Sequence, residues 1–269
     1  MKPLRTVVCI KPVPSPDHYH QVGIDPATKT LIRQGIPTVI NPLDKNALEA
    51  ALQIRERCGG EVLVVSMAPP AAGENLREAL AMGADGAYLL SDRSFAGSDT
   101  LATSMVLASA VKKLGPVDLV LTGNESADGG TAQVSAQLGE WLDCPHLMHA
   151  CGLEVVDGGE FIRVDTAREN CRVVYQVKLP AVVSVVRTIN RPRFTSLMGV
   201  IQARTKPLTC WTCDDLPVDK NFLGLEGSPT RAGDIYQPDL SRRCELVQGS
   251  TEEIAGALIR KLRAAGLQL

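Results

Sequence analysis

The chain has 269 residues, enough to bury a full hydrophobic core in one large or two small domains. Its 28 Lys and Arg residues nearly balance its 30 Asp and Glu residues, which argues against binding to nucleic acid or to a membrane surface. The apolar run before Lys11 is too short for a signal peptide or a membrane span, so we expect a cytoplasmic protein. The eight cysteines are scattered and do not suggest a disulfide framework.

Aliphatic strands and amphipathic helices alternate along the first half of the chain. Residues 4–10 and 61–67 are nearly all aliphatic, as is typical of central parallel strands covered on both faces. Residues 42–58 and 100–114 place apolar side chains at helical spacing, so each helix should bury one side. This order predicts an α/β fold, with a mostly parallel, Rossmann-like sheet and helices on both faces. Further elements of the pattern are a helix at 74–82, strands at 87–90 and 119–122, and a helix with Val134, Leu138, Trp141 and Leu142 on its apolar side.

A long excursion separates the first strand from the first helix. Residues 11–37 are rich in Pro, Asp, His and Gly, and residues 23–33 within them favour a short hairpin. His18 and His20 are spaced like metal ligands, but no Cys, Asp or Glu completes a site. We therefore expect no metal.

The first helix begins with residues that favour helix entry. Asn41 is expected to cap it, Pro42 takes the first helical position and Asp44 the third. Helix capping alone is enough to explain these residues. A functional interpretation adds that this helix start lies on the same edge of the sheet as the loop that begins at Gly123.

The loop from Gly123 to Thr131 joins a buried strand to a helix and contains three glycines. Such a loop lets backbone amides approach a ligand, and the free amides at a helix start favour an anion. The loop therefore predicts a phosphate or pyrophosphate site. An ordinary glycine turn with an Asp cap remains an alternative.

After Pro145 the pattern changes to strands separated by acidic or glycine-containing turns. These strands either extend the sheet or form a small antiparallel ribbon beside it, and Asp157 and Gly158 favour a hairpin. We place a nucleotide-binding domain at residues 1–206. Residues 207–269 are expected to form an extended arm that ends in a helix and packs on a partner chain. The expected strands are residues 152–156, 161–166, 171–178 and 181–186.

Several common catalytic motifs are missing. The sequence has neither the Gly-x-Gly-x-x-Gly dinucleotide fingerprint nor a Walker loop, and it has no Gly-x-Ser-x-Gly elbow. Cys210 and Cys213 form a lone Cys-x-x-Cys without the second pair of a zinc site, so a structural or incidental pair is favoured over redox or metal chemistry. We assign no catalytic residue and no metal ligand.

Six stretches in order resemble the β subunit of electron-transfer flavoproteins, and they cover nearly the whole chain. They are VVCIKPVP, NPLDKNALEAAL, REALAMGADGAYLL, DLVLTGNESADGGTAQV, LPAVVSV and NRPRFTSLMGVIQARTKP. The resemblance implies an α/β nucleotide-binding subunit. It also implies a heterodimer with a larger α subunit that carries its own FAD. The arm of this chain would wrap around that α subunit.

The resemblance implies nucleotide contacts at strand ends and helix starts. Amides of Gly123 and of residues 129–132 would hold phosphate oxygens. Asn41 and Asp44 would bond to ribose or adenine. Cys9 and Met67 would supply apolar walls for the adenine. The implied contacts are Cys9, Asn41, Pro42, Leu43, Asp44, Met67, Gly123, Asn124, Glu125, Ser126, Ala127, Asp128, Gly129, Gly130, Thr131, Ala132, Gln133 and Val134.

A second implied surface is a docking loop. Residues 191–204 resemble the family's loop that meets acyl-CoA dehydrogenase partners, with Leu197 as its apolar anchor. A plain surface connection is the alternative.

The family divides on the nucleotide in this subunit. One group holds structural AMP and passes single electrons, whereas the other holds a second FAD, takes hydride from NADH and sends electrons both to the α-subunit FAD and to ferredoxin or flavodoxin. Two stretches resemble the FAD group, Gly224 to Arg231 and the helix start with Asp99, Thr100 and Thr103.

The sequence departs from the family's pattern at two places. Leu43 replaces a usual aromatic residue, which weakens a stacking contact, and Asn124-Glu125 replaces a common Lys-Gln pair, which weakens a charged contact with phosphate.

A more distant alternative is a stand-alone adenine-nucleotide-binding regulator, which would be a homodimer. That regulator would have no redox function, whereas in a flavoprotein the flavin, not a side chain, would carry the redox chemistry.

Overall fold

The computed structural model of the protein describes residues 2–21, 23–24, 31–32, 35–231, 233 and 244–267. The chain divides into two compact units, Met1–Gly233 and Asp234–Leu269. The strands are β1 Leu4–Cys9, β2 Pro12–Pro14, β3 Gly23–Ile24, β4 Leu31–Ile32, β5 Thr38–Ile40, β6 Gly60–Met67, β7 Gly86–Leu90, β8 Leu119–Gly123, β9 His146–Val156, β10 Phe161–Ala167, β11 Arg172–Lys178, β12 Ala181–Val185 and β13 Leu208–Trp211. The helices are α1 Pro42–Cys58, α2 Gly73–Met82, α3 Thr100–Lys113, α4 Val134–Leu142, α5 Leu197–Ala203, α6 Gly224–Gly227 and α7 Thr251–Ala264.

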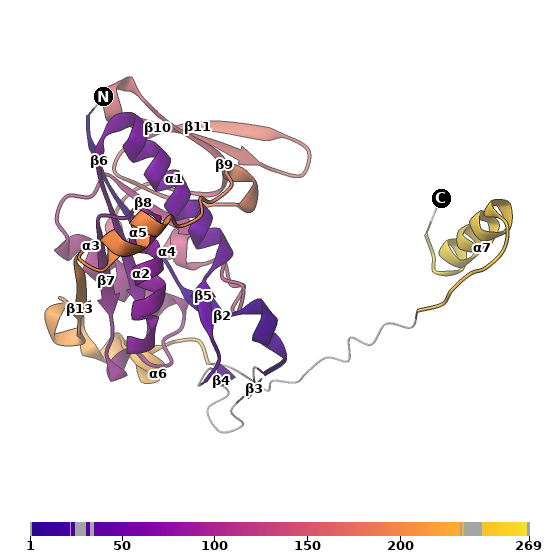
Figure 1. Ribbon diagram of the computed structural model, residues 1–269, viewed down its shortest axis with the longest axis horizontal. Helices are drawn as coiled ribbons and strands as arrows, with labels where there is room; N and C mark the ends of the chain where they lie inside the picture. The colour runs from indigo at the N-terminus through magenta and orange to yellow at the C-terminus, as the bar shows by residue number, and fades with distance from the viewer. Residues whose placement is uncertain are drawn as a thin grey trace. The chain divides into compact units, whose positions relative to one another are not determined.

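The first unit is built on a nine-stranded sheet in the order β11-β10-β9-β12-β8-β1-β6-β7-β13 (Figure 1). The strands from β9 to β13 in this order run parallel, and β10 pairs antiparallel with both β9 and β11. The predicted α/β fold is confirmed. Of the two possibilities for the strands after Pro145, the structure has the extension of the sheet.

Two hydrophobic cores cover the two faces of the sheet, as the aliphatic strands predict. Along β1, Val7 packs in a cluster with residues of α3 and α4, whereas its neighbour Val8 packs in a cluster with residues of α1 and α2. Successive side chains of a strand point to opposite faces, so a strand buried on both faces must be apolar throughout. Both valines are completely buried.

Strand β13 lies at the start of the segment that the sequence predicts as an extended arm. Within this segment, residues 207–269, Leu208–Trp211 pairs in parallel with β7 at the edge of the sheet, and the first unit extends to Gly233. The Trp211 ring lies against Tyr88 of β7, with centroids 4.6 Å apart. A four-residue edge strand is too short to show periodicity, and it is stabilised by pairing with a distant segment.

The predicted hairpin at residues 23–33 is present in its described part, where β3 pairs antiparallel with β4. Its turn, and the side chain of His20, lie outside the described residues.

The second unit contains the predicted terminal helix, α7. It begins with a capping box, in which the Ser250 hydroxyl accepts from the Glu253 N–H and the Glu253 carboxylate accepts from the Ser250 N–H. Its apolar residues Ile254, Leu258 and Ile259 are exposed.

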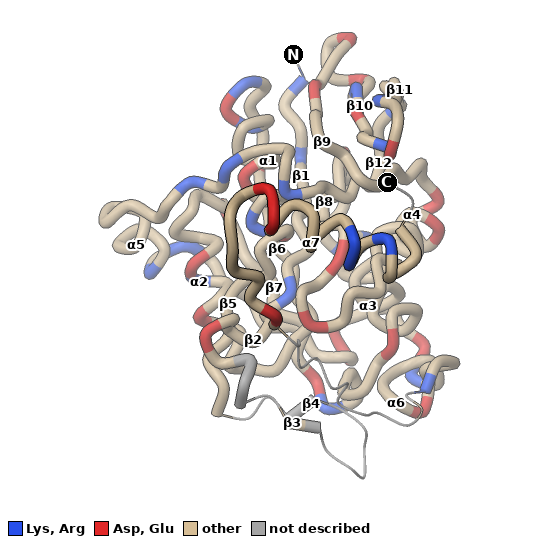
Figure 2. Tube along the Cα trace, turned by 90° about the vertical axis from the view of Figure 1, so that its right-hand side faces the viewer, with Lys and Arg blue, Asp and Glu red and all other residues tan. Residues whose placement is uncertain are grey.

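Charged residues of both signs are interspersed along the chain (Figure 2). In the part of the chain that the structure describes, no helix combines the length and apolarity needed to cross a membrane.

Candidate functional site

The carboxyl ends of β1 and β8 lie side by side where the chain reverses its direction through the sheet. From β1 the chain builds outward through β6 and β7, and it then returns to place β8 on the other side of β1. In open α/β sheets, ligands bind outside the carboxyl ends of strands at such a switch point. The residues that follow these two strands therefore define the candidate site.

Asp44 in the first turn of α1 connects the two strand ends. Its Oδ2 accepts a hydrogen bond from the Lys11 N–H at 2.8 Å, and its Oδ1 accepts from the Gly123 N–H at 3.0 Å. Asn41 Nδ2 donates to the same Oδ1 at 3.0 Å. Burial raises the pKa of Asp44 to about 7, although these N–H donors act to lower it. Asp44 thus fixes the helix start against both strands.

Asn41 occupies the N-cap position of α1, but the prediction that its side chain caps the helix is wrong. Its Oδ1 accepts from the Ala127 N–H at 3.1 Å, and its Nδ2 also donates to the Glu125 carbonyl at 2.8 Å. The loop after β8 has therefore taken the oxygen that a cap requires. Through these bonds the Asn41 and Asp44 side chains hold the backbone at the ends of β1 and β8 and in the loop that follows β8.

Gly123 allows the close approach of α1 to β8. A β-carbon at this position would lie 2.4 Å from Asp44 Oδ1 and 2.7 Å from Leu43 Cβ. Any larger residue would push the helix start away from the strand.

Lys11 fastens the middle of the loop to the end of β1. Its Nζ lies 2.6 Å from Asp128 Oδ1 and donates to Ser126 Oγ at 3.1 Å. The Gly129 N–H donates to the same hydroxyl at 3.3 Å, and the Gly130 N–H donates to the Ser126 carbonyl at 2.8 Å. These bonds fold the loop into a compact turn whose outer residues remain exposed.

The end of this loop presents unpaired donors at the start of α4. Within residues 35–231, where the loop and its neighbours lie, no acceptor is found for the backbone N–H groups of residues 131–136. The Ser135 hydroxyl is buried and has no partner among the described residues. Ala132 has φ +52°, a left-handed conformation that non-glycine residues rarely adopt. Free N–H groups and a hydroxyl at a helix start are the kind of donors that favour an anion.

The starts of α3 and α4 are joined by hydrogen bonds. Thr100 Oγ1 donates to Gln133 Oε1 at 2.9 Å and accepts from Gln137 Nε2 at 3.3 Å. Thr103 follows in the first turn, and its N–H donates to the Asp99 carbonyl at 3.0 Å. The predicted segments after β7 and after β8 therefore meet in one place.

Asp99 caps α3, and it also holds a distant segment. Its Oδ1 accepts from the Ala102 N–H, and its Oδ2 accepts from the Thr230 N–H, each at 3.0 Å. The Asp99 N–H donates to the buried Ser228 hydroxyl at 2.8 Å. Residues 224–230 are thus fastened beside the start of α3, a contact that no local pattern in the sequence indicated.

Cys9 and Met67 lie at the ends of the neighbouring strands β1 and β6 in one apolar cluster. Burial raises the pKa of the Cys9 thiol to about 12, and the nearby Asp44 charge adds to this effect. The thiol is therefore neutral near pH 7 and contributes an apolar surface.

The remaining predicted residues lie around these groups. Asn124 is buried, its N–H donates to the Val185 carbonyl at 3.0 Å, and its Oδ1 accepts from Ser184 Oγ at 3.2 Å. Pro42 and Leu43 form the first turn of α1. Glu125, Thr131 and Gln133 are exposed, and Val134 begins α4.

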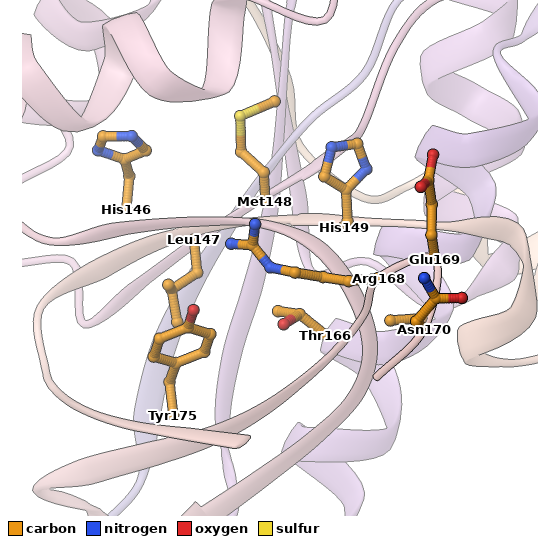
Figure 3. Close-up of a pocket in the computed structure, with 10 residues that line it drawn as sticks. His146, Leu147, Met148, His149, Thr166, Arg168, Glu169, Asn170 and Tyr175 are labelled. Carbon is orange, nitrogen blue, oxygen red and sulfur yellow. The ribbon is translucent and has the colours of Figure 1, made fainter. Parts of the chain in front are cut away.

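Two pockets lie elsewhere in the first unit, and no pattern in the sequence predicted them. One, of about 900 Å³, is lined by the side chains shown in Figure 3, which come from β9, from β10 and β11, and from the connection between the last two. The other, of about 530 Å³, lies between α2 and the segment that contains α5. Neither is formed by the strand ends at the switch point.

The predicted docking loop presents a group of exposed apolar side chains. Leu197 begins α5 and is 77% exposed, Phe194 is 90% exposed and Met198 is 61% exposed. Exposed apolar side chains that lie close together in this way are typical of surfaces that bind partners.

Comparisons with known proteins agree over most of the chain. The family model for the electron transfer flavoprotein domain matches residues 28–216. An electron transfer flavoprotein subunit beta of Thermoanaerobacterium thermosaccharolyticum is 44% identical over 262 residues, which cover 97% of this chain and 98% of that protein. Subunit CarD of the caffeyl-CoA reductase-Etf complex of Acetobacterium woodii is 42% identical with the same coverage. Protein FixA of Bradyrhizobium diazoefficiens is 40% identical over 95% of this chain and 90% of its own length.

Proposed function

We propose, from the premise that this chain belongs to the electron transfer flavoprotein β-subunit family, that it binds FAD at the β1/β8 switch point within a heterodimer. The observation that carries the proposal is that the described residues offer no acceptor for the N–H groups of residues 131–136 and no partner for the buried Ser135 hydroxyl. These donors fit a phosphate group, because a helix start with free amides favours negative charge.

The neighbouring start of α3 favours FAD over AMP. A diphosphate carries two phosphate groups, and the joined starts of α3 and α4 offer two sets of first-turn amides. Thr103 and the amides of Thr100 and Leu101 would hold one phosphate group, and Ser135 with the amides of 131–136 would hold the other. AMP would need only the second set.

The other predicted residues would shape the site. Cys9 and Met67 would supply apolar surface for the adenine. Asn41 and Asp44 would act through the loop, because their side chains hold the backbone of residues 123–127 in position.

The chemistry that FAD supplies when bound is acceptance of a hydride from NADH and delivery of the electrons one at a time, to the α-subunit FAD and to ferredoxin or flavodoxin. The chain's own groups would bind and orient the nucleotide, and we assign no side-chain acid, base or nucleophile. The similarity to CarD, a subunit of a reductase-Etf complex, supports this branch of the family.

Two surfaces would serve partners. The exposed apolar residues of α7 would pack on the α subunit, together with the rest of the chain that follows the first unit. The loop around Leu197 would dock a dehydrogenase of the acyl-CoA dehydrogenase type, which exchanges electrons with the α-subunit FAD.

Mass spectrometry of nucleotides extracted from the co-expressed heterodimer tests the proposal. We expect two FAD per heterodimer and bleaching of the flavin absorbance by NADH. One FAD and one AMP, with no response to NADH, would replace the proposal with that of a carrier holding structural AMP. A homodimer without an α subunit would point to the stand-alone regulator.

A further inference from the structure

We propose that Glu49 and Arg193 form a clamp that positions the docking loop, and that Arg193 acts through this clamp instead of touching the docked dehydrogenase. The inference rests on the proposed docking function of Leu197. It assigns a role to two residues that lie outside the nucleotide site, and the following contacts carry it.

The Arg193 guanidinium is held by two carboxylates of helix α1, those of Glu49 and Glu56. Its Nε donates to Glu49 Oε2 at 2.7 Å, its Nη2 donates to Glu49 Oε1 at 3.1 Å, and its Nη1 donates to Glu56 Oε1 at 2.6 Å. The Arg193 N–H also donates to Glu49 Oε2 at 3.2 Å. Two parallel bonds between a guanidinium and a carboxylate fix both distance and orientation.

Glu49 is suited to a fixed role because it is buried. Its residue is only 4% exposed, and Gln53 Nε2 donates to its Oε1 at 2.8 Å. A buried carboxylate requires partners, so the backbone at Arg193 is held against the third turn of α1.

A reciprocal pair of asparagines holds the loop one turn earlier on the same helix. Asn46 Nδ2 donates to the Asn190 carbonyl at 2.9 Å, and Asn190 Nδ2 donates to the Asn46 carbonyl at 3.0 Å. The loop is therefore attached to α1 at residues 190 and 193, directly before the exposed Phe194.

The other side of the docking surface is fixed to α2. A β-carbon on Gly199 would lie 2.3 Å from the Ala81 carbonyl oxygen, so α5 packs directly on the backbone of α2. Arg77 Nη1 donates to the Lys206 carbonyl at 2.9 Å, and Lys206 Nζ donates to the Ala84 carbonyl at 2.6 Å. Leu197 is thus an exposed side chain on a backbone that is fastened at both ends.

This arrangement favours positioning over direct contact. A loop that is already fixed loses less conformational entropy when a partner binds, which strengthens docking without adding a contact. Three of the five guanidinium N–H donors of Arg193 are already used within the chain, so an acidic partner would have to compete with Glu49 and Glu56 for this side chain.

Steady-state kinetics with the purified heterodimer test the clamp, with an acyl-CoA dehydrogenase reduced by its acyl-CoA substrate as the electron donor. We expect Glu49→Gln and Arg193→Met each to raise the KM for the dehydrogenase by about fivefold to tenfold, with kcat within about twofold. The double variant removes both members of the buried pair, so its KM should be raised but no higher than in either single variant. Hydrogen exchange of residues 190–203 should be faster in all three.

The two single variants change the charge in opposite directions, which separates the clamp from a direct contact. If Arg193→Met raises KM while Glu49→Gln and the exchange rates stay at wild-type values, Arg193 touches the partner and the clamp is overturned. Wild-type KM in the double variant overturns it as well. Arg191→Met, which changes an exposed neighbouring arginine, is the matched control and should leave hydrogen exchange unchanged.

Leu197→Ala separates failure of the clamp from failure of the docking surface. If it raises KM and the clamp variants do not, only the clamp is wrong. If Leu197→Ala also leaves KM unchanged, the proposed docking surface itself is wrong, and with it the clamp's function. Nucleotide content equal to that of the wild type in every variant shows that the heterodimer is intact.

Discussion

The Asp44 carboxylate and Gly123 are in such close contact that only a glycine fits opposite it. The Gly123 N–H donates to Asp44 Oδ1 at 3.0 Å, and a β-carbon on Gly123 would approach that oxygen to 2.4 Å. The contact joins the start of α1 to the end of β8 across 79 residues of sequence. The loop that would hold the nucleotide phosphates begins at this point, so its position depends on this contact.

Gly123→Ala should therefore destabilise the protein by about 1–3 kcal/mol, as overpacking of a tight contact usually does. The new methyl group would meet the fixed Asp44 carboxylate and the backbone of α1, so the strain cannot be relieved locally. Urea unfolding of the heterodimer measures the effect. Gly73→Ala is the control, because a β-carbon on Gly73 would have no neighbour within 4 Å and we expect no loss of stability. Equal stability of the two variants would contradict the argument.

The ionisation of Asp44 should make stability depend on pH. Burial raises its pKa from the ordinary value of 3.8 to about 7. Between these values the folded protein holds a proton that the unfolded chain has released, so this contribution to stability falls as the pH rises through that window.

Asp44→Asn cannot titrate, so it isolates this contribution. The stability advantage of the wild type over the variant should shrink by about 3 kcal/mol between pH 5 and pH 8. Urea unfolding at several pH values gives the difference, in which the other titrating groups cancel. A difference that stays constant over this range would mean that Asp44 has the same pKa in both states.

Ser135→Ala should weaken nucleotide binding. The hydroxyl is buried without a partner among the described residues, and a hydrogen bond to a charged phosphate contributes about 1.5–3 kcal/mol. We expect the dissociation constant for FAD in reconstitution of the nucleotide-free heterodimer to rise at least about tenfold. Ser109→Ala is the control, because Ser109 is buried in α3 well beyond its first turn. The same constant in both variants would remove Ser135 from the site.

Leu197→Ala should raise the KM for the dehydrogenase by about tenfold, as truncation of an apolar anchor does at an interface. The side chain is 77% exposed, so the fold should keep its stability. Val174→Ala, at a 54% exposed position of β11, provides the comparison and should leave KM unchanged. An equal response to the two substitutions would show that the loop around Leu197 is not a specific docking surface.

Local patterns in the sequence were sufficient to predict the layered fold and to propose where the candidate site lies. Aliphatic runs indicate buried strands and helical spacing indicates amphipathic helices because these periodicities follow from backbone geometry. Gly123 and the polar loop after it stood out because the loop contains three glycines and joins a buried strand to a helix. Edge strand β13 did not, because four residues carry too little periodicity and the strand depends on pairing with β7.

The sequence by itself therefore determined the alternation of strands and helices and the loop that follows β8, and its resemblance to a family predicted Leu197 as an anchor. Only the tertiary structure decided which atoms the polar residues bind. Asn41 looks like a cap but holds a loop 86 residues away, and Arg193 meets Glu49 across 144 residues. The physical reason is that periodicity is a property of neighbouring residues, whereas a hydrogen-bond partner is set by how remote segments pack.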